Sequence, residues 1–276
     1  IRDRDGSEDL MIVGEWMEPK LLINNNGIFV DNSHEYGLQG NRGIWWSITV
    51  ADLDGGGDDD YVLGNLGKNN KFKASAEHPF KVYANDVENH GTNEIVVAKF
   101  YKIDYVPVRG RDCTSQQMPY VAEKFEDYHS FASSKLFEIL PEDKVDEAVM
   151  YEIKSFESIV LINENGKFIK KALPNKAQVS PIKSSLVLDF NEDGINDILV
   201  VGNHYGVEVE TTRYDAGYGK ILLGAKDGSF KAMSPKESGF YVPFDSRDLS
   251  QVTIKGQKSI VVTNNNDELK IFSPKG

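Results

Sequence analysis

Hydrophobic positions along this chain gather in short runs rich in β-branched residues, and polar, glycine-rich segments separate the runs. Runs of this kind are typical of β-strands. Asn-Gly and Asp-Gly turns between apolar runs predict β-hairpins. The clearest hairpin segments are LLINNNGIF (21–29), IVLINENGKF (159–168) and ILLGAKDGSF (221–230). The pattern therefore predicts an all-β fold.

Segment 116–147 departs from this pattern, because its apolar residues recur at a spacing close to the period of a helix. They would form two helical faces, one of Val121, Phe125 and Tyr128 and the other of Leu136, Ile139 and Leu140. We expect two or three short helices here, inserted into the β structure. No Pro- or Ser-rich linker divides the chain, which favours a single region over 1–276.

Several predicted strands follow an Asp-rich loop, and this unit of loop and strand recurs along the chain. Together with the hairpins it gives about four strands per repeat, the organisation of a β-propeller blade. The loops are unevenly spaced, so we expect a shortened blade between Asp54 and Glu88 and the helical insertion before Asn191.

The number of repeats bears on whether the propeller can close. About five repeats are recognisable, and Ile1 falls inside the first loop. We therefore expect a partial or unusually short ring. Further blades of a longer parent protein, or a partner, would cover its open edge.

The loops follow the pattern D-x-[DN]-x-D-G-x-x-D, with oxygen ligands at positions 1, 3, 5, 7 and 9 and a glycine for the turn. Calcium takes about 6–8 oxygen ligands, so the pattern predicts Ca²⁺ as the cofactor. The most complete loop offers Asp189, Asn191, Asp193, the carbonyl of Ile195, and Asp197. An EF-hand needs a bidentate Glu at position 12, where this chain has Leu63 or Val200, so the ion would lie between strands.

The other loops are less complete, and we expect the 189–197 loop to bind most tightly. Gly56 replaces the fifth-position ligand in the second loop. His90 stands there in the third, and nitrogen suits a hard cation poorly. Lys255 stands there in the fifth loop, which should bind no metal. The remaining candidate ligands are Asp52, Asp54, Asp58 and Asp60 in the second loop, Asp3, Asp5, Ser7 and Asp9 in the first, and Asp86, Glu88 and Glu94 in the third.

Charge and motifs narrow the functional classes. The net charge of -12 disfavours nucleic acid as a partner, because an acidic surface repels phosphate backbones. No apolar run is long enough to predict a transmembrane segment. The sequence has none of the motifs of zinc proteases, α/β-hydrolases or P-loop enzymes, so no catalytic residue is assigned. His204, Tyr205 and Arg213 come nearest to a catalytic group, and exposed loop residues are the simpler interpretation.

At its Asp-rich loops and the strands around them, the chain resembles the FG-GAP/VCBS repeat family, which is related to the integrin α propeller. The resemblance is carried by DLDGGGDDDYVLGNLG (52–67), RYDAGYGKILLGAKDGSF (213–230) and NNNDELKIF (264–272), and covers nearly all of the chain outside the helical insertion. It implies a calcium-binding propeller of the bacterial branch that often accompanies an ASPIC/UnbV domain. It also implies a secreted or cell-surface location. The third and fifth loops depart from the family pattern.

Three functions fit these features. The first is a calcium-stabilised extracellular scaffold that binds a glycan or a protein. The second is a polysaccharide lyase or another carbohydrate-active enzyme, and the third is a passive structural propeller within a larger protein. The lack of a catalytic motif favours the first function. A cluster of His, Tyr and Arg at one centre would favour the second.

Overall fold

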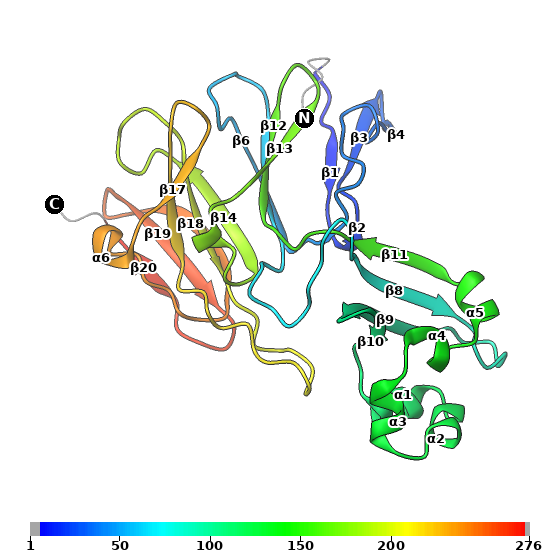
Figure 1. The fold of residues 1–276 in the computed structure, drawn as a ribbon. Coiled ribbons are helices and arrows are strands. Elements are labelled where there is room, and N and C mark those ends of the chain that lie inside the picture. The colour runs from blue at the N-terminus through cyan, green and yellow to red at the C-terminus, as the bar shows by residue number, and fades with distance from the viewer. Residues whose placement is uncertain (1–5, 274–276) are drawn as a thin grey trace. The chain divides into compact units, whose positions relative to one another are not determined.

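A computed structural model describes residues 6–273 of the chain. It divides into two compact units. The main unit comprises the described residues up to Lys71 and those from Phe156 onward, and the inserted unit comprises Phe72–Ser155. Antiparallel sheets predominate in the chain (Figure 1), in agreement with the all-β prediction, although the inserted unit combines one sheet with five short helices. None of the helices within 6–273 has the length and apolar character that crossing a membrane requires.

Within the described residues, the main unit contains four antiparallel sheets and a short two-stranded ladder. The first sheet, in the order β1-β3-β4, consists of β1 (Leu10–Ile12), β3 (Lys20–Asn25) and β4 (Ile28–Asp31). The second, β6-β7-β12-β13, consists of β6 (Ser47–Ala51), β7 (Asp60–Gly64), β12 (Ile159–Asn163) and β13 (Phe168–Ala172). The ladder pairs β2 (Glu15–Met17) with β5 (Gly43–Ile44).

The third and fourth sheets lie in the C-terminal half of the chain. The third, β14-β15-β16-β17, consists of β14 (Ile182–Leu188), β15 (Asp197–Gly202), β16 (Lys220–Gly224) and β17 (Phe230–Ala232). The fourth, β18-β19-β20, consists of β18 (Ser246–Ile254), β19 (Gln257–Asn264) and β20 (Lys270–Phe272). Two short helical turns connect them to their neighbours, a 3₁₀ turn at Asn175–Ala177 and α6 (Pro235–Ser238).

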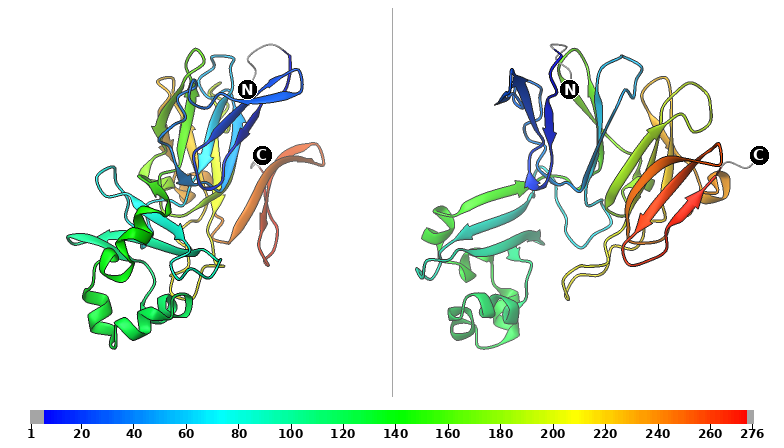
Figure 2. Two further views of the ribbon diagram at one scale, coloured as in Figure 1. Left: turned by 90° about the vertical axis from the view of Figure 1, so that its right-hand side faces the viewer. Right: turned by 180° about the vertical axis from the view of Figure 1, so that it is seen from behind.

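The continuous apolar runs of the sequence are strands that are buried on both faces. Because side chains alternate across a strand, neighbouring residues pack into different cores. In β7, Leu63 packs in a cluster with Leu21 of the first sheet, whereas Val62 packs with Ile198 of the third. In β15, Ile198 packs toward the second sheet, whereas its neighbour Leu199 packs with residues of the fourth sheet. The sheets of the main unit are therefore stacked face to face in chain order, as Figures 1 and 2 show.

All three hairpins predicted from the sequence are present, as β3–β4, β12–β13 and β16–β17. The Asn-Gly turns explain two of them. Asn26 and Gly27 both have positive φ, of 55° and 91°. Asn165 and Gly166 repeat this geometry, with 55° and 80°. Positive φ at both central residues is the requirement of a type I′ turn, which asparagine and glycine meet most easily.

Along the sequence, the inserted unit lies between β7 and β12, and these two strands pair directly with each other in the second sheet. It has its own antiparallel sheet in the order β10-β9-β8-β11, from β8 (Phe80–Asn85), β9 (Glu94–Tyr101), β10 (Asp104–Pro107) and β11 (Val149–Ile153). The third Asp-rich loop joins β8 to β9 and so belongs to this inserted sheet. The close spacing of Asp54 and Glu88 therefore does not mark a shortened blade. It marks the start of the insertion.

Helices occupy the predicted segment of the inserted unit, but the predicted number and one predicted face were wrong. Five short helices form, and the first begins at Arg111, five residues before the predicted start. They are α1 (Arg111–Gln117), α2 (Tyr120–Lys124), α3 (Tyr128–Ser133), α4 (Leu136–Ile139) and α5 (Glu142–Asp146). Val121 and Leu136 are fully buried, as expected. Tyr128 is 65% exposed, because a new helix begins at this residue and changes the direction of the face.

Within the described residues the sheets of the main unit remain separate, and no strand pairing joins the first sheet to the last. These described residues form no closed barrel or ring. One connection nevertheless recurs. A first strand, a loop and an antiparallel second strand are followed by a third strand on the far side of the second, as in β6-β7-β12, β14-β15-β16 and β18-β19-β20.

Candidate metal-binding loops

Each Asp-rich loop is tied to its sheet by the carboxylate at position 9. Asp60 Oδ2 accepts the backbone N–H of Leu53 at 2.7 Å, and Asp197 Oδ2 accepts that of Phe190 at 2.9 Å. Glu94 Oε2 accepts the N–H of Val87 in the same way, at 2.7 Å. In all three loops the donor is the residue at position 2. Position 9 therefore closes the loop on itself.

The other oxygen of the position 9 carboxylate reaches the third strand. Asp60 Oδ1 accepts the N–H of Asn163 at the end of β12, at 2.7 Å, and Asp197 Oδ1 accepts that of Gly224 at the end of β16, at 2.8 Å. Asp9 Oδ1 accepts the N–H of Asn24 in β3, at 2.9 Å. The same residue type thus joins loop, second strand and third strand in three sheets.

The position 1 carboxylate holds the turn of each loop. Asp189 accepts backbone N–H groups of Asp193 and Gly194, and Asp86 accepts those of His90 and Gly91. In the second loop Asp52 accepts the N–H groups of two glycines, Gly55 and Gly57. These bonds draw each loop into a tight turn, which gathers its side chains on one side.

The second loop gathers three carboxylates. Oxygen atoms of Asp52, Asp54 and Asp60 lie within 4.8 Å of one another. Gly56 adjoins them, because a Cβ there would lie 2.9 Å from Asp54 Oδ1 and 3.1 Å from Asp58 Oδ1. The missing ligand at position 5 is thus a glycine whose small size lets the carboxylates approach.

Electrostatics in the second and fourth loops favour a cation. Burial raises the pKa of Asp60 above its usual value, and the negative charges of Asp54 and Asp58 raise it further, although two backbone hydrogen bonds act in the opposite sense. Burial, together with the charge of Asp193, likewise raises the pKa of Asp197. The ionised carboxylates are destabilised by their surroundings, and a bound cation would relieve this. All-oxygen donors are what a hard divalent cation prefers, so these residues fit calcium.

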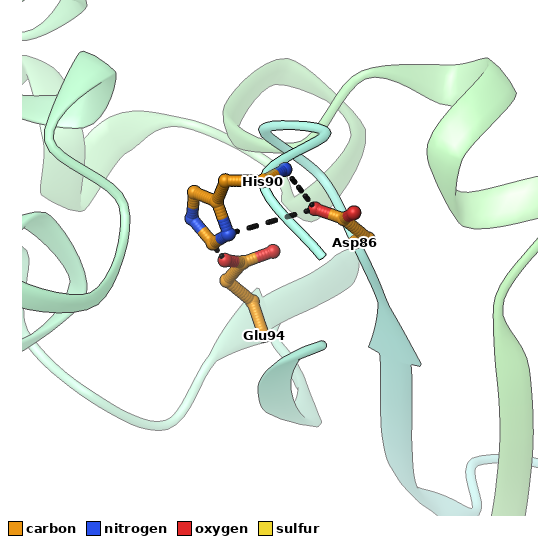
Figure 3. A group of neighbouring side chains, drawn as sticks. All are labelled: Asp86, His90 and Glu94. Atoms are coloured by element: carbon orange, nitrogen blue, oxygen red, sulfur yellow. Dashed lines mark hydrogen bonds and ion pairs between the residues drawn. The ribbon is translucent and has the colours of Figure 1, made fainter. Parts of the chain in front are cut away.

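The third loop has a different donor set, drawn in Figure 3. His90 lies between two carboxylates, with Nε2 3.1 Å from Glu94 Oε1 and Nδ1 3.7 Å from Asp86 Oδ1. Atoms of Asp86, His90 and Glu94 lie within 4.8 Å of one another. Sequence reasoning counted Glu88 and discounted His90, but the imidazole is at the centre of the group, with Glu88 Oε2 3.6 Å from Nε2. A mixed nitrogen and oxygen set suits zinc or a similar ion better than calcium.

A lysine side chain of the inserted unit also contacts the third loop. Lys144 Nζ of α5 donates to the carbonyl of Asp86 at 3.0 Å and to Asn89 Oδ1 at 2.5 Å. The hydrogen bonds from Gly91 and His90, with a weaker effect of the His90 and Lys144 charges, lower the pKa of Asp86. Lys144 therefore compensates part of the negative charge of this loop.

The fourth loop, expected to be the tightest, does not form a comparable group of three carboxylates among the described residues. Asn191 Nδ2 donates to Asp193 Oδ2 at 2.9 Å, and Asp193 Oδ1 accepts the N–H of Ile195. Its acidic side chains are thus satisfied within the loop. The order of affinities remains a prediction.

The first and fifth loops match the Asp-rich pattern least well within the described residues. Asp3 and Asp5 lie outside the described residues. Ser7 Oγ donates to the carbonyl of Asn24, and Asp9 Oδ2 is buried without a partner among residues 6–273. The fifth loop is the tight β18–β19 turn with Lys255 at positive φ, and its position 9 residue, Ser259, bonds to the hydroxyl of Ser273.

Sequence reasoning missed a second polar cluster in the main unit. Lys183 Nζ lies 2.8 Å from the centroid of the Trp46 ring, and that ring lies 5.2 Å from the ring of His204. Asp245, which pairs with Arg247 at 2.8 Å, acts on both Lys183 and His204 through its charge. Trp46, Lys183, His204 and Asp245 each have a buried polar atom without a hydrogen bond in the described chain.

Burial dominates the electrostatics of this cluster. It lowers the pKa of Lys183 to about 7, with a further contribution from the charge of Arg247. It also lowers the pKa of His204, as does the nearby Lys183. Only His204 stood out in the sequence. Trp46, Lys183 and Asp245 lie at or just before the first strands of three successive sheets, a relationship that only the topology reveals.

Comparison with known proteins adds no assignment to this geometry. No protein-family model matches the chain, and none of the curated proteins matches it.

Proposed function

We propose that this chain is a calcium-stabilised scaffold on the surface of a bacterial cell or in its secretions, where it binds a glycan or protein ligand. The observation that carries the proposal is the convergence of Asp52, Asp54 and Asp60 oxygens within 4.8 Å beside Gly56. Extracellular calcium modules commonly have dissociation constants of about 10⁻⁴–10⁻³ M. Loops with few ligands and solvent access fit that range and an environment rich in calcium.

Within this proposal the fold is a partial β-propeller of the FG-GAP/VCBS kind. Two features support it: the strand connection shared by the stacked sheets, and the position 9 carboxylate that recurs in three of them. The inserted unit would then be an insertion in the sequence of one blade, between β7 and β12. Further blades of a longer parent protein, or a partner, would complete the ring.

Calcium titration by calorimetry tests the proposal at the second loop. We expect saturable binding by the unaltered protein and weaker binding by Asp54→Ala, which removes the oxygen ligand at position 3. Asp59→Ala is the matched control, because it removes the same charge from the same loop outside the group of three. Equal binding by all three proteins would show that the acidic loop is not a calcium site.

A carbohydrate-active enzyme is the second candidate, and the cluster around Lys183 and His204 is the observation that favours it. With a lowered pKa, each of these side chains is a potential general base near neutral pH. Tyr205 and Arg213 adjoin it, with the guanidinium 4.3 Å from the ring centroid. The polar atoms are buried, however, so a substrate would reach them only after side chains move.

A further inference from the structure

The inserted unit contains a cavity of about 350 Å³. Its walls come from the end of β9, from the segment that follows β10, and from α3. The six residues that give it its chemistry are Lys99, Tyr101, Arg109, Arg111, Tyr128 and Ser134. This volume is at the lower end of the range for small-molecule sites, about 300–1,000 Å³.

The cavity gathers positive charge in a protein whose net charge is -12. Three of its lining side chains are cationic and none is acidic. All residues of the inserted unit are among those that the structure describes. Neither the side chain of Lys99 nor that of Arg109 makes a hydrogen bond or ion pair with any described residue. Arg111 is fixed, because its Nε donates to the carbonyl of Phe125 at 2.6 Å and Nη2 to that of Ala122 at 3.2 Å. Two cations are thus left to pair with a ligand.

Two tyrosine rings flank these charges. Tyr101 is 56% exposed and Tyr128 is 65% exposed. Tyr128 is held in place, because its hydroxyl donates to Asp112 Oδ2 at 2.9 Å and the Arg111 guanidinium lies 5.7 Å from its ring centroid. A further cation, Lys102, lies 5.2 Å from the ring of Tyr101. Exposed aromatic faces of this kind stack on flat apolar surfaces, and the apolar Val106, Val108 and Phe131 also line the cavity.

We infer that this cavity binds a uronic-acid residue of an acidic polysaccharide. The carboxylate would pair with Arg109 and Lys99, since a guanidinium matches a carboxylate in geometry and charge. The C–H face of the pyranose would lie on a tyrosine ring. The Ser134 hydroxyl donates to the carbonyl of Ser130 at 2.8 Å, and its oxygen can accept from a sugar hydroxyl. The exposure of both tyrosines leaves the mouth open, so neighbouring sugars of the chain can extend outward. The inference rests on the proposed binding role and names its ligand, but it does not depend on calcium.

Titration with trigalacturonate and with a neutral galactose trisaccharide tests the inference. We expect binding of the acidic trisaccharide only, with an affinity that falls as salt is raised. Arg109→Gln should weaken it by at least about tenfold, because a hydrogen bond to a charged group is lost. Tyr128→Phe should bind and Tyr128→Ala should not, since the ring supplies the contact. Lys170→Gln, which removes an exposed lysine of β13 in the main unit, is the matched control and should bind normally.

Several results would overturn the inference. They are equal binding of the neutral trisaccharide, no binding of either sugar, or full binding by the Arg109 variant with an unchanged melting temperature. Binding of galactose 6-phosphate in place of trigalacturonate would also overturn it. Calcium titration of the same samples separates the two proposals. If the unaltered protein binds calcium but not trigalacturonate, this inference alone is contradicted. If the unaltered protein does not bind calcium, the proposed function is contradicted.

Discussion

Asp60 and Leu53 are joined by a short hydrogen bond, in which the buried carboxylate accepts the backbone N–H of Leu53 at 2.7 Å. With its second oxygen bound to Asn163, Asp60 has a structural role in addition to its proposed role as a calcium ligand. Asp54 in the same loop is exposed, and outside its proposed metal role its carboxylate only accepts the backbone N–H of Gly56, at 2.8 Å within the loop. The two residues can therefore be separated by experiment.

Asp60→Asn should lower the free energy of unfolding by about 1–3 kcal/mol even in EDTA, because the amide NH₂ would face a backbone donor that the carboxylate now satisfies. Asp54→Ala should change it by less than about 0.5 kcal/mol in EDTA, because Asp54 and its hydrogen bond from Gly56 are exposed, and should reduce stability only in calcium. Urea unfolding of both variants, with and without calcium, measures this difference. An Asp60 variant that is as stable as the unaltered protein in EDTA would refute the structural role.

Asp193→Ala should lower the melting temperature in calcium and change it little in EDTA. The reason is that Asp189 and Asp197 would face each other without their cation. Glu192→Gln, a charge-removing change at the neighbouring exposed residue, is the control. If the Asp193 variant loses the same stability in both conditions, the 189–197 loop is only an acidic turn.

The stability of the chain should rise with pH between about 7 and 10.5, with a contribution from Lys183 of up to about 1.4 kcal/mol per pH unit. Burial lowers the pKa of Lys183 to about 7 in the folded state, from 10.5 for an exposed lysine. Between these values the unfolded chain binds a proton that the folded chain does not, so raising the pH favours folding. The groups that face Lys183 are Trp46, His204, Arg247, Asp245 and Glu15.

Lys183→Met tests this directly, because methionine fills a similar volume without a charge. Unfolding in urea across pH 6–10 should show a more stable protein near neutrality and a flatter profile. A variant with the same pH profile as the unaltered protein would show that Lys183 keeps its proton in the folded state.

Incubation with a panel of acidic polysaccharides should yield no unsaturated product, as judged by ultraviolet absorbance. The expectation follows from the burial of the His204 and Lys183 polar atoms, which no substrate reaches in this conformation. Calcium-dependent product that disappears in His204→Gln would instead support the enzyme candidate.

The strands and hairpins could be predicted from sequence because their signals are local. The Asn26-Gly27 turn and the apolar run around Val62 each carry their structure in a few neighbouring residues. Pairing of Val62 with Val160 could not be predicted, because the whole inserted unit lies between them. The close spacing of Asp54 and Glu88, which the sequence suggested was a shortened blade, marks the start of that insertion.

The candidate loops were predicted in position but not in detail. The pattern identified Asp52, Asp54 and Asp60, which the fold brings together. It could not show that Asp60 is also committed to two backbone donors, since one of them, Asn163, comes from a distant strand. It also undervalued His90, because ligand type alone does not reveal that the ring lies between two carboxylates.

The most direct test of the central claim is the unfolding free energy of the unaltered chain in calcium and in EDTA, with magnesium as the control. At a hundredfold excess of calcium over the dissociation constant, one site that binds only the folded state adds about 2.7 kcal/mol. We predict a gain of at least this size in calcium and a smaller one in magnesium. The same unfolding curve in calcium and EDTA would contradict the account.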